Sequence, residues 1–302
     1  GPDRRPRVSE VNVGLPGGIT EYDRAHRARH GRPSGIFGEI ERIARESHGL
    51  PFSEYLSSLP FLESLKKTKI WLDGRGPLPD RFHPALRLED KWVQVRILTG
   101  GFPVPETIPL DADRRDDALE LLNRRGKLVS KLRSGRGGRG LLAIEREAAL
   151  DAAFASGEPR LLQEWIDSRV ARFTYSIRAV VFAGRWVCAY ANLAERAFSN
   201  HGTIAVVEEG DSLRLADETF KTRRFDDRSW EAKLWFGADD PAYLHHNLYE
   251  DEAAETALLL PPPLFAAVRD TAVRIERFYE SLDFASLPPA WFEENRGLGP
   301  AR

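Results

Sequence analysis

The sequence predicts an α+β fold in which neighbouring strands pair mainly as hairpins, rather than a plain doubly wound parallel sheet. Three observations support this class: a strand–glycine loop–strand unit at 128–144, a second hairpin pattern at 175–192, and a long amphipathic helix at 263–282. The chain has 302 residues. At about 100–200 residues per domain, this length suits one large domain or two to three small ones.

The composition excludes several classes of protein. The net charge of −2 implies no general surface for polyanions, so nucleic acid is not an expected partner. The single cysteine, Cys188, rules out an intrachain disulfide framework and a cysteine-rich zinc site, and we expect it in the core. No apolar run approaches the length of a membrane span and no signal peptide is visible, so we expect a cytoplasmic enzyme without a membrane partner.

The front of the chain is rich in Arg, Gly and Pro up to residue 35, and Gly1-Pro2 has the form of a protease-cleavage remnant. The chain contains no methionine, and nothing in the composition explains this. Glycine and proline cluster again at Gly74–Pro84, which makes this stretch the expected domain boundary. The elements expected before it are a strand at Val8–Leu15, helices at Ile36–His48 and Phe52–Leu65, and a short strand at Lys69–Leu72.

The pattern becomes regular from residue 88 onward. Apolar residues at helical spacing predict helices at Glu89–Leu98, Arg115–Arg124, Glu147–Ala155 and Pro263–Leu282, with Gly126 and Gly157 as stop signals. Short apolar or alternating runs predict strands at Thr107–Leu110, Leu128–Leu132, Leu141–Ile144, Leu161–Ile166, Tyr175–Phe182, Trp186–Asn192 and Thr203–Val207.

The strongest local signal is the loop Ser134–Gly140, which carries four glycines. Glycines let backbone N–H groups approach an anion without a Cβ in the way. Gly135, Gly137 and Gly140 match G-x-G-x-x-G, but a dinucleotide-binding fold needs a helix after the loop, and a strand is expected there. We therefore expect the loop to form the tip of a hairpin.

One lysine, Lys131, lies on the strand just before this loop. A protein kinase carries its lysine on the strand after the loop, and neither H-R-D, D-F-G nor the P-loop pattern is present. The remaining interpretation is a lysine that contacts a phosphate, beside a glycine hairpin that closes over it. The alternative is a solvated hairpin without a ligand. Arg133, Arg136 and Arg139 are either solvated or hold a phosphate or an acidic substrate.

Several motifs, in the right order, resemble the ATP-grasp superfamily. Glu89–Trp92, Leu98 and Phe102–Thr107 resemble its "DK…L…g.pvP.T" segment. Leu128–Lys131 with the glycine loop resembles "vvKP..G.gG.Gv", with Leu132 where proline is usual. Leu161–Ile166 resembles the "lvQeyI" strand, and Asp283, Glu293 and Asn295 resemble the terminal "D…E.N" set. The resemblance covers residues 85–302.

This resemblance implies an ATP-grasp fold, in which two α+β subdomains sandwich ATP after a short N-terminal α/β domain. The implied units are an N-terminal domain at 1–85, a subdomain with the glycine hairpin at 86–165, and a C-terminal subdomain with the metal site at 166–302. An aromatic-rich insertion at 211–260 interrupts the last unit. It is either a substrate lid or an oligomer contact, so a homodimer is one possibility.

The resemblance also assigns residues to ATP. Lys91 and Lys131 would contact the phosphates, and Arg178 and Arg196 would hold the transferring phosphate or the acyl phosphate. The hinge strand would offer backbone groups to the adenine edge, with a ring contact from Trp165 or Ile166 and a ribose contact from Asp167. The full set for the nucleotide is Lys91, Lys131, Gly135, Gly137, Gly138, Gly140, Gln163, Glu164, Trp165, Ile166 and Asp167.

For the metal, the resemblance implies Mg²⁺ held by Asp283, Glu293 and Asn295, which offer hard oxygen ligands. The alternative is that Glu293-Glu294 is a solvated acidic pair; Glu293 is preferred as the ligand, because Glu293 and Asn295 share one face of a strand. Ser176 stands where many relatives carry an aspartate, which puts that role in doubt. His245-His246 is better explained as a surface pair than as a metal site, because adjacent strand residues point to opposite faces.

The implied function is that of an ATP-dependent carboxylate–amine ligase, which forms an amide or peptide bond through an acyl phosphate. Its substrates would be small-molecule or peptide carboxylates and amines. Two alternatives stay open. One is a catalytically inactive nucleotide-binding or regulatory protein of the same fold. The other is an ATP-dependent small-molecule phosphotransferase, which stops at a phosphorylated product.

Overall fold

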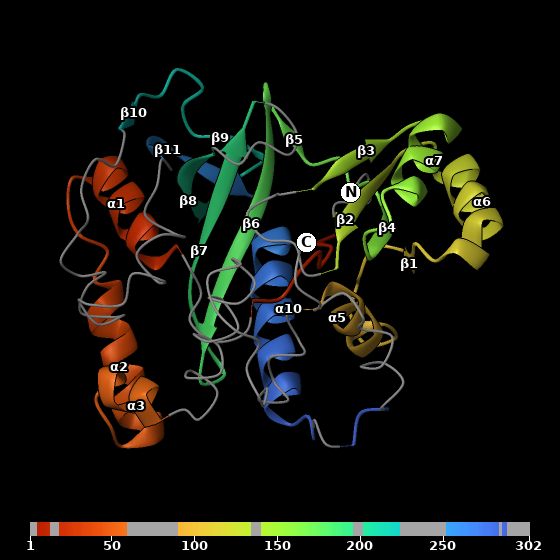
Figure 1. The fold of residues 1–302 in the computed structure, drawn as a ribbon. Helices are drawn as coiled ribbons and strands as arrows, with labels where there is room; N and C mark the ends of the chain where they lie inside the picture. Colours follow the sequence, from red (N-terminus) through yellow and green to blue (C-terminus); the bar gives the residue numbers. More distant parts are fainter. Residues whose placement is uncertain are drawn as a thin grey trace.

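A computed structural model of the chain describes residues 5–12, 18–58, 90–133, 140–195, 202–223, 252–283 and 286–288. Two β-sheets with helices on their faces make up these residues, so the prediction of an α+β fold is confirmed (Figure 1). Within the described ranges, no helix combines the length and the apolar character that crossing a membrane requires.

The smaller sheet has four antiparallel strands in the order β1-β4-β2-β3. Helices α6 (Arg115–Arg125) and α7 (Glu147–Ala155) cover one face of this sheet (Figure 1). Leu128, Ile144 and Leu162 pack against these helices from the sheet. The strands are β1 (Thr107–Pro109), β2 (Leu128–Leu132), β3 (Leu142–Ile144) and β4 (Arg160–Glu164).

The larger sheet has seven strands, with the order β10-β11-β8-β7-β6-β5 and β9 paired to β11. Only β11 and β8 run parallel; every other neighbouring pair in the described sheet is antiparallel. Helix α10 (Pro262–Glu280) packs on one face through Phe265 and Val268. The strands are β5 (Arg169–Val170), β6 (Phe173–Phe182), β7 (Arg185–Ala194), β8 (Thr203–Glu209), β9 (Arg214–Leu215), β10 (Thr222–Arg223) and β11 (Glu252–Leu260).

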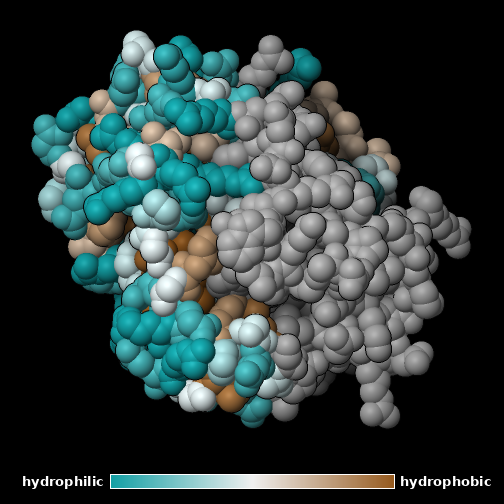
Figure 2. Space-filling view, turned by 90° about the vertical axis from the view of Figure 1, so that its left-hand side faces the viewer, coloured by the Kyte–Doolittle hydropathy of each residue, from teal (hydrophilic) through white to brown (hydrophobic). Residues whose placement is uncertain are grey.

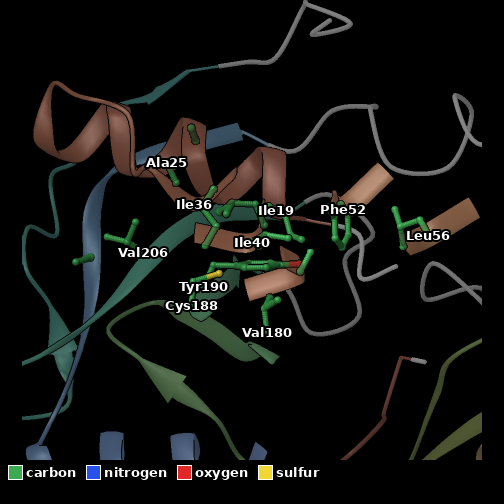
Figure 3. Packing of buried hydrophobic residues seen from close by; sticks show 14 residues of the cluster. Ile19, Ala25, Ile36, Ile40, Phe52, Leu56, Val180, Cys188, Tyr190 and Val206 are labelled. Carbon is green, nitrogen blue, oxygen red and sulfur yellow. The ribbon is translucent and has the colours of Figure 1, made fainter. Parts of the chain in front are cut away.

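The other face of the larger sheet is covered by the N-terminal helices α1 (Ile19–His30), α2 (Ile36–His48) and α3 (Phe52–Ser58). Figure 3 shows the Tyr190 ring between the isoleucines of α1 and α2 and Val180 of β6. A Cβ at Gly18, whose φ is +104°, would overlap the Tyr190 hydroxyl, so only glycine fits where α1 begins. Seen from this side, the described outer surface is mostly hydrophilic (Figure 2).

Helix α5 (Lys91–Leu98) joins the two sheets. Val93, Ile97 and Leu98 pack against Ile275 and Tyr279 of α10. The N-terminus of α5, in turn, is held by residues at the end of β2. The helix therefore fixes the smaller sheet relative to the helix that lies on the larger one.

Several predicted elements are confirmed with their bounds, including the helix at Ile36–His48, the strand at Leu128–Leu132 and the helix at Glu147–Ala155. Gly126 ends α6 with a φ of 71°, as predicted. The strand–loop–strand unit is a hairpin, because β2 and β3 pair antiparallel. This confirms that the glycine loop does not lead into the helix that a dinucleotide-binding fold requires.

Two expectations at the front of the chain are wrong or incomplete. The described part of the expected strand at Val8–Leu15, residues 8–12, forms no strand. Helix α1 was not predicted, because its twelve residues are mostly polar or charged and carry few apolar side chains. The helix expected at Phe52–Leu65 is formed over Phe52–Ser58, and its remainder, Lys69–Leu72 and Gly74–Pro84 lie outside the described residues.

The end of the segment 211–260 belongs to the larger sheet. Residues 252–260 form β11, which lies between β8 and β10 and is mostly buried. The pattern did not predict a strand there, because a strand buried on both faces lacks the alternation of apolar and polar residues. The aromatic stretch at 224–251 lies outside the described residues, and the proposed division into domains stays a prediction.

Candidate functional site

The face of the smaller sheet opposite α6 and α7 carries a row of polar side chains. Leu128 and Ser130 alternate with Val129 and Lys131 along β2, so Lys131 projects from the opposite face to Leu128, which packs under the helices. Lys131 Nζ donates to Gln163 Oε1 of β4 at 2.6 Å, and Gln163 Nε2 donates to Thr107 Oγ1 of β1 at 2.9 Å. Three neighbouring strands thus hold the Lys131 ammonium in place.

Lys131 is partly buried, and this changes its acidity. Burial lowers its pKa from 10.5 to about 8, because an ammonium loses hydration there. The nearby Glu10 carboxylate raises the pKa and the Lys91 ammonium lowers it. Both Glu10 and Lys91 are therefore close enough to Lys131 to act on its charge.

A buried ion pair brings Lys91 to the end of β2. Arg133 Nη2 and Asp90 Oδ2 lie 2.8 Å apart, with side chains only 6% and 1% exposed. Asp90 Oδ1 also accepts from the N–H of Trp92 at 2.7 Å, which caps α5. The Lys91 N–H donates to the Arg133 carbonyl at 3.0 Å. The sequence left open whether Arg133 is solvated or binds an anion. In the structure, Arg133 pairs with Asp90 of the protein itself.

Lys91 contacts a carboxylate that also acts on the charge of Lys131. Lys91 Nζ lies 3.3 Å from Glu10 Oε1, and the same carboxylate raises the pKa of Lys131. Glu10 lies about eighty residues before Lys91 in the chain, and no motif pointed to it. The two lysines that the sequence predicted for phosphate are therefore close enough for their charges to interact, and an anionic side chain of the protein contacts Lys91.

The end of the glycine loop is anchored beside this site. Gly140 has a φ of +72°, and a Cβ there would lie 2.7 Å from Leu132 Cδ1, so a larger residue is strained and crowded. Its carbonyl accepts from Arg160 Nη1 at 2.7 Å, and Arg160 is buried. Gly135, Gly137 and Gly138 lie outside the described residues.

The hinge strand is shorter than predicted. Strand β4 ends at Glu164, so Trp165 and Ile166 lie beyond it. The N–H of Glu164 donates to the Glu106 carbonyl at 2.8 Å, and the N–H of Trp165 to the Lys127 carbonyl at 3.4 Å. Because β4 is paired on both sides, the strand itself is not an open edge for adenine, and an adenine contact has to come from groups that follow it.

The side chains at this hinge already have partners in the protein. Glu164 Oε1 lies 3.4 Å from Arg125 Nη1, and Asp167 Oδ1 lies 3.3 Å from Arg169 Nε. Lys127 Nζ lies 3.9 Å from the centre of the Trp165 ring. An adenine ring packed on Trp165 would therefore share it with Lys127 or use its other face.

Arg178 lies on the other sheet. It is opposite Tyr190 on the face of β6 and β7 that α1 and α2 cover, whereas α5 packs on α10 at the opposite face. Burial raises the pKa of Tyr190, and a hydrogen bond from Arg178 counteracts this effect. The described contacts do not bring Arg178 to the lysine pair, and its catalytic role stays a prediction. Cys188 is buried in the same core, as predicted.

Of the three predicted metal ligands, the structure describes Asp283. It is exposed, just after α10, and its backbone carbonyl accepts from Ser286. Glu293 and Asn295 lie outside the described residues, as does Arg196. In the part of the chain that is described, no three His, Cys, Asp or Glu side chains gather in a way that could hold a metal ion.

No model of a known protein family matches the sequence, and no curated protein matches it either. Three solved structures are similar to this chain. One is the ATP-grasp ligase PsnB, complexed with a phosphomimetic variant of a minimal precursor, Mg and ADP. It is 16% identical with a TM-score of 0.30, over 42% of this chain and 39% of that one.

The second is D-alanyl-alanine synthetase A from Vibrio cholerae, 13% identical with a TM-score of 0.28, over 57% of this chain and 49% of that one. The third is D-cycloserine synthetase DcsG, 18% identical with a TM-score of 0.27, over 80% of this chain and 81% of that one. This chain thus covers less than half of the length of PsnB and of D-alanyl-alanine synthetase A. Because these identities are 18% or lower and the TM-scores are 0.30 or lower, the activity is inferred below from this chain's own residues.

We predict that Asp90→Ala lowers the free energy of unfolding by about 3–5 kcal/mol, because it leaves the Arg133 guanidinium buried without its carboxylate. The double variant Asp90→Ala/Arg133→Met should lose less than the sum of the two single changes. Chemical denaturation of the four proteins of this cycle measures the coupling.

Asp151→Ala is the matched control, since it removes a carboxylate from the exposed ion pair with Arg115. It should cost about 1 kcal/mol or less. Strictly additive losses at Asp90 and Arg133 would contradict the assigned anchor.

Proposed function

We propose that the protein is an ATP-dependent carboxylate–amine ligase of the ATP-grasp type, and that Lys91 and Lys131 hold the phosphates of ATP. One observation carries the proposal: the Lys91 ammonium, at the N-terminus of α5, lies 3.3 Å from the Glu10 carboxylate, and both groups are close enough to the Lys131 ammonium on β2 to shift its pKa. Two partly buried cations near each other are unfavourable without an anion. The arrangement is what a polyphosphate needs.

The surroundings of the two lysines support a phosphate rather than a single carboxylate as ligand. Lys131 lies on the strand that leads into the glycine loop, whose other end is fixed at Gly140 by Arg160. Backbone N–H groups of Gly135, Gly137, Gly138 and Gly140 then add neutral donors around the phosphate oxygens. Gln163 accepts a hydrogen bond from the Lys131 ammonium, and Thr107 in turn accepts one from Gln163, so the two residues position the ammonium.

For the adenosine, the proposal uses the chain just after β4. Because the N–H groups of Glu164 and Trp165 already donate within the protein, the adenine edge falls to backbone groups that follow them, near Ile166. In this proposal, Gln163 contributes through its side chain, which binds the Lys131 ammonium, and its backbone does not contact the adenine. Asp167 is the residue for the ribose hydroxyls, and the ring packs on Trp165 or Ile166.

Mg²⁺, held by Asp283, Glu293 and Asn295, supplies neutralisation of the phosphate charge when it is bound. Carboxylate and amide oxygens suit this hard cation, and the exposed position of Asp283 leaves it accessible to a metal. Arg196 is the proposed partner of the transferring phosphate, to which a guanidinium can bind through two N–H groups. The same role for Arg178 stays a prediction from sequence alone, since Arg178 lies with Tyr190 on the face of the larger sheet that α1 and α2 cover.

The proposed reaction has two steps and needs no covalent enzyme nucleophile. A carboxylate oxygen of the substrate attacks the γ-phosphorus, the bond to ADP breaks, and an acyl phosphate forms. An amine nitrogen then attacks the acyl carbon, phosphate leaves, and the amine releases a proton as the amide forms. The protein contributes by positioning both reactants and by stabilising charge on the phosphate oxygens.

ADP formation from Mg²⁺-ATP, measured with panels of amino acids, peptides and small carboxylic acids, each with and without an amine, tests the activity. The proposal predicts ADP release that requires a particular carboxylate and an amide product that requires the amine. A stable phosphorylated product that forms without an amine would select the alternative function, an ATP-dependent small-molecule phosphotransferase. Nucleotide binding without turnover would select the inactive regulator, and absence of nucleotide binding would contradict all three.

The acidity of Lys131 predicts how ATP binding depends on pH. Since burial lowers its pKa to about 8, the ammonium loses its proton as the pH rises past this value, and its attraction for phosphate disappears. ATP affinity should therefore fall at alkaline pH. A bound phosphate favours the charged ammonium and raises its pKa, so the fall in affinity occurs at a higher pH than the pKa of the free protein alone would give. Lys131→Met should bind ATP at least about 10-fold more weakly at pH 7 and lose most of this pH dependence.

Calorimetric titration with a non-hydrolysable ATP analogue between neutral and alkaline pH provides the measurement. The control is Lys221→Met, which removes an exposed lysine from another part of the chain. Unchanged affinity in Lys131→Met, with the control also unchanged, would count against the phosphate site as proposed.

A further inference from the structure

We propose that the N-terminal segment 5–12 is an internal competitor for the nucleotide, with the Glu10 carboxylate taking the place of a phosphate beside Lys91. This inference rests on the proposed function, because it concerns the same two lysines. It assigns a regulatory contact to a residue that no motif singled out.

The backbone of the segment is tied to α5 and to the loop that follows it. The Val11 N–H donates to Gln94 Oε1 at 3.0 Å, and Gln94 Nε2 donates to the Val11 carbonyl at 2.7 Å. The Val8 N–H donates to the Pro103 carbonyl at 2.9 Å. Gln94 is itself buried on α5, three residues after Lys91. The segment is therefore held next to the lysine that its carboxylate contacts.

Apolar side chains add a second anchor. Val8 and Val11 pack on the cluster that α5 and α10 form around Val93 and Ile275. The segment, red in Figure 1, runs beside these helices. With Val8 and Val11 on the apolar cluster, Glu10 between them extends to Lys91, at 3.3 Å. The anchors place the carboxylate; the ion pair alone does not hold the segment.

The ion pair itself is weak enough to be exchanged. The Glu10 side chain is 42% exposed, whereas that of Lys91 is 11% exposed. A partly exposed carboxylate retains hydration and gains little from its ion pair. A polyphosphate carries more charge and reaches both lysines at once, so it can displace this carboxylate. The tethered carboxylate nevertheless competes at a high effective concentration, which weakens apparent nucleotide affinity.

The charge balance explains why such a contact is favourable without nucleotide. The Lys91 charge and burial both lower the pKa of Lys131, while Glu10 raises it. The Glu10 carboxylate thus favours the charged form of Lys131. When phosphate binds, it takes over this role and the carboxylate moves out to solvent.

Glu10→Gln tests the proposal, because it removes the charge and keeps the size of an exposed side chain. The expected result is that the Kd for a non-hydrolysable ATP analogue falls about 3- to 10-fold. The reason is that the nucleotide no longer has to displace the Glu10 carboxylate. The matched control is Glu218→Gln, which removes an exposed carboxylate in the turn before β10 and should leave the Kd unchanged. Titration calorimetry of the three proteins at one ionic strength gives the Kd values.

Two results would overturn the inference while leaving the proposed function intact. If Glu10→Gln binds the analogue as tightly as the unchanged protein, Glu10 does not compete with phosphate. If it binds more weakly, Glu10 helps to build the site. If neither protein binds a nucleotide, the proposed function fails and this inference fails with it, so the two failures are distinguishable.

Discussion

The buried ion pair between Asp90 and Arg133 is the constraint on which the rest of the site depends. Asp90 caps α5 and Arg133 follows β2, so the pair joins the start of the helix to the end of the strand. Lys91 and Lys131 lie one and two residues away from these partners. A pair this deeply buried is costly to separate, because either charge alone would lack both water and a partner. The two lysines therefore stay together whether or not a ligand is present.

Bringing two ammonium groups together is unfavourable, and the surrounding residues show how the structure offsets this. Gln163, itself bound to Thr107, offers a neutral oxygen to the Lys131 ammonium, and Glu10 contributes a negative charge beside Lys91. Burial and the Lys91 charge nevertheless lower the pKa of Lys131. A further anion is thus favourable at this place, and this is the physical basis for a phosphate site. Helix α5 then links that site through α10 to the larger sheet, on which Arg178 lies.

Local patterns predicted the elements whose signals are themselves local. The amphipathic helix at Ile36–His48 and the hairpin around the glycine loop follow from periodicity and turn residues alone. Glu10 could not be found this way, because its contact joins residues about eighty positions apart and depends on the anchors at Val8 and Val11. Arg133 was ambiguous in sequence, since nothing local distinguishes a buried arginine from a solvated one. Trp165 and Ile166 follow a strand that ends earlier than its apolar run suggests.

The central claim, that Lys91 and Lys131 form the phosphate site, is tested most directly by a crystal structure of the protein grown with Mg²⁺ and ADP. The account predicts phosphate oxygens within hydrogen-bond distance of Nζ of both Lys91 and Lys131, with the Glu10 carboxylate no longer beside Lys91. A nucleotide bound elsewhere, or one whose phosphates contact neither lysine, would contradict it.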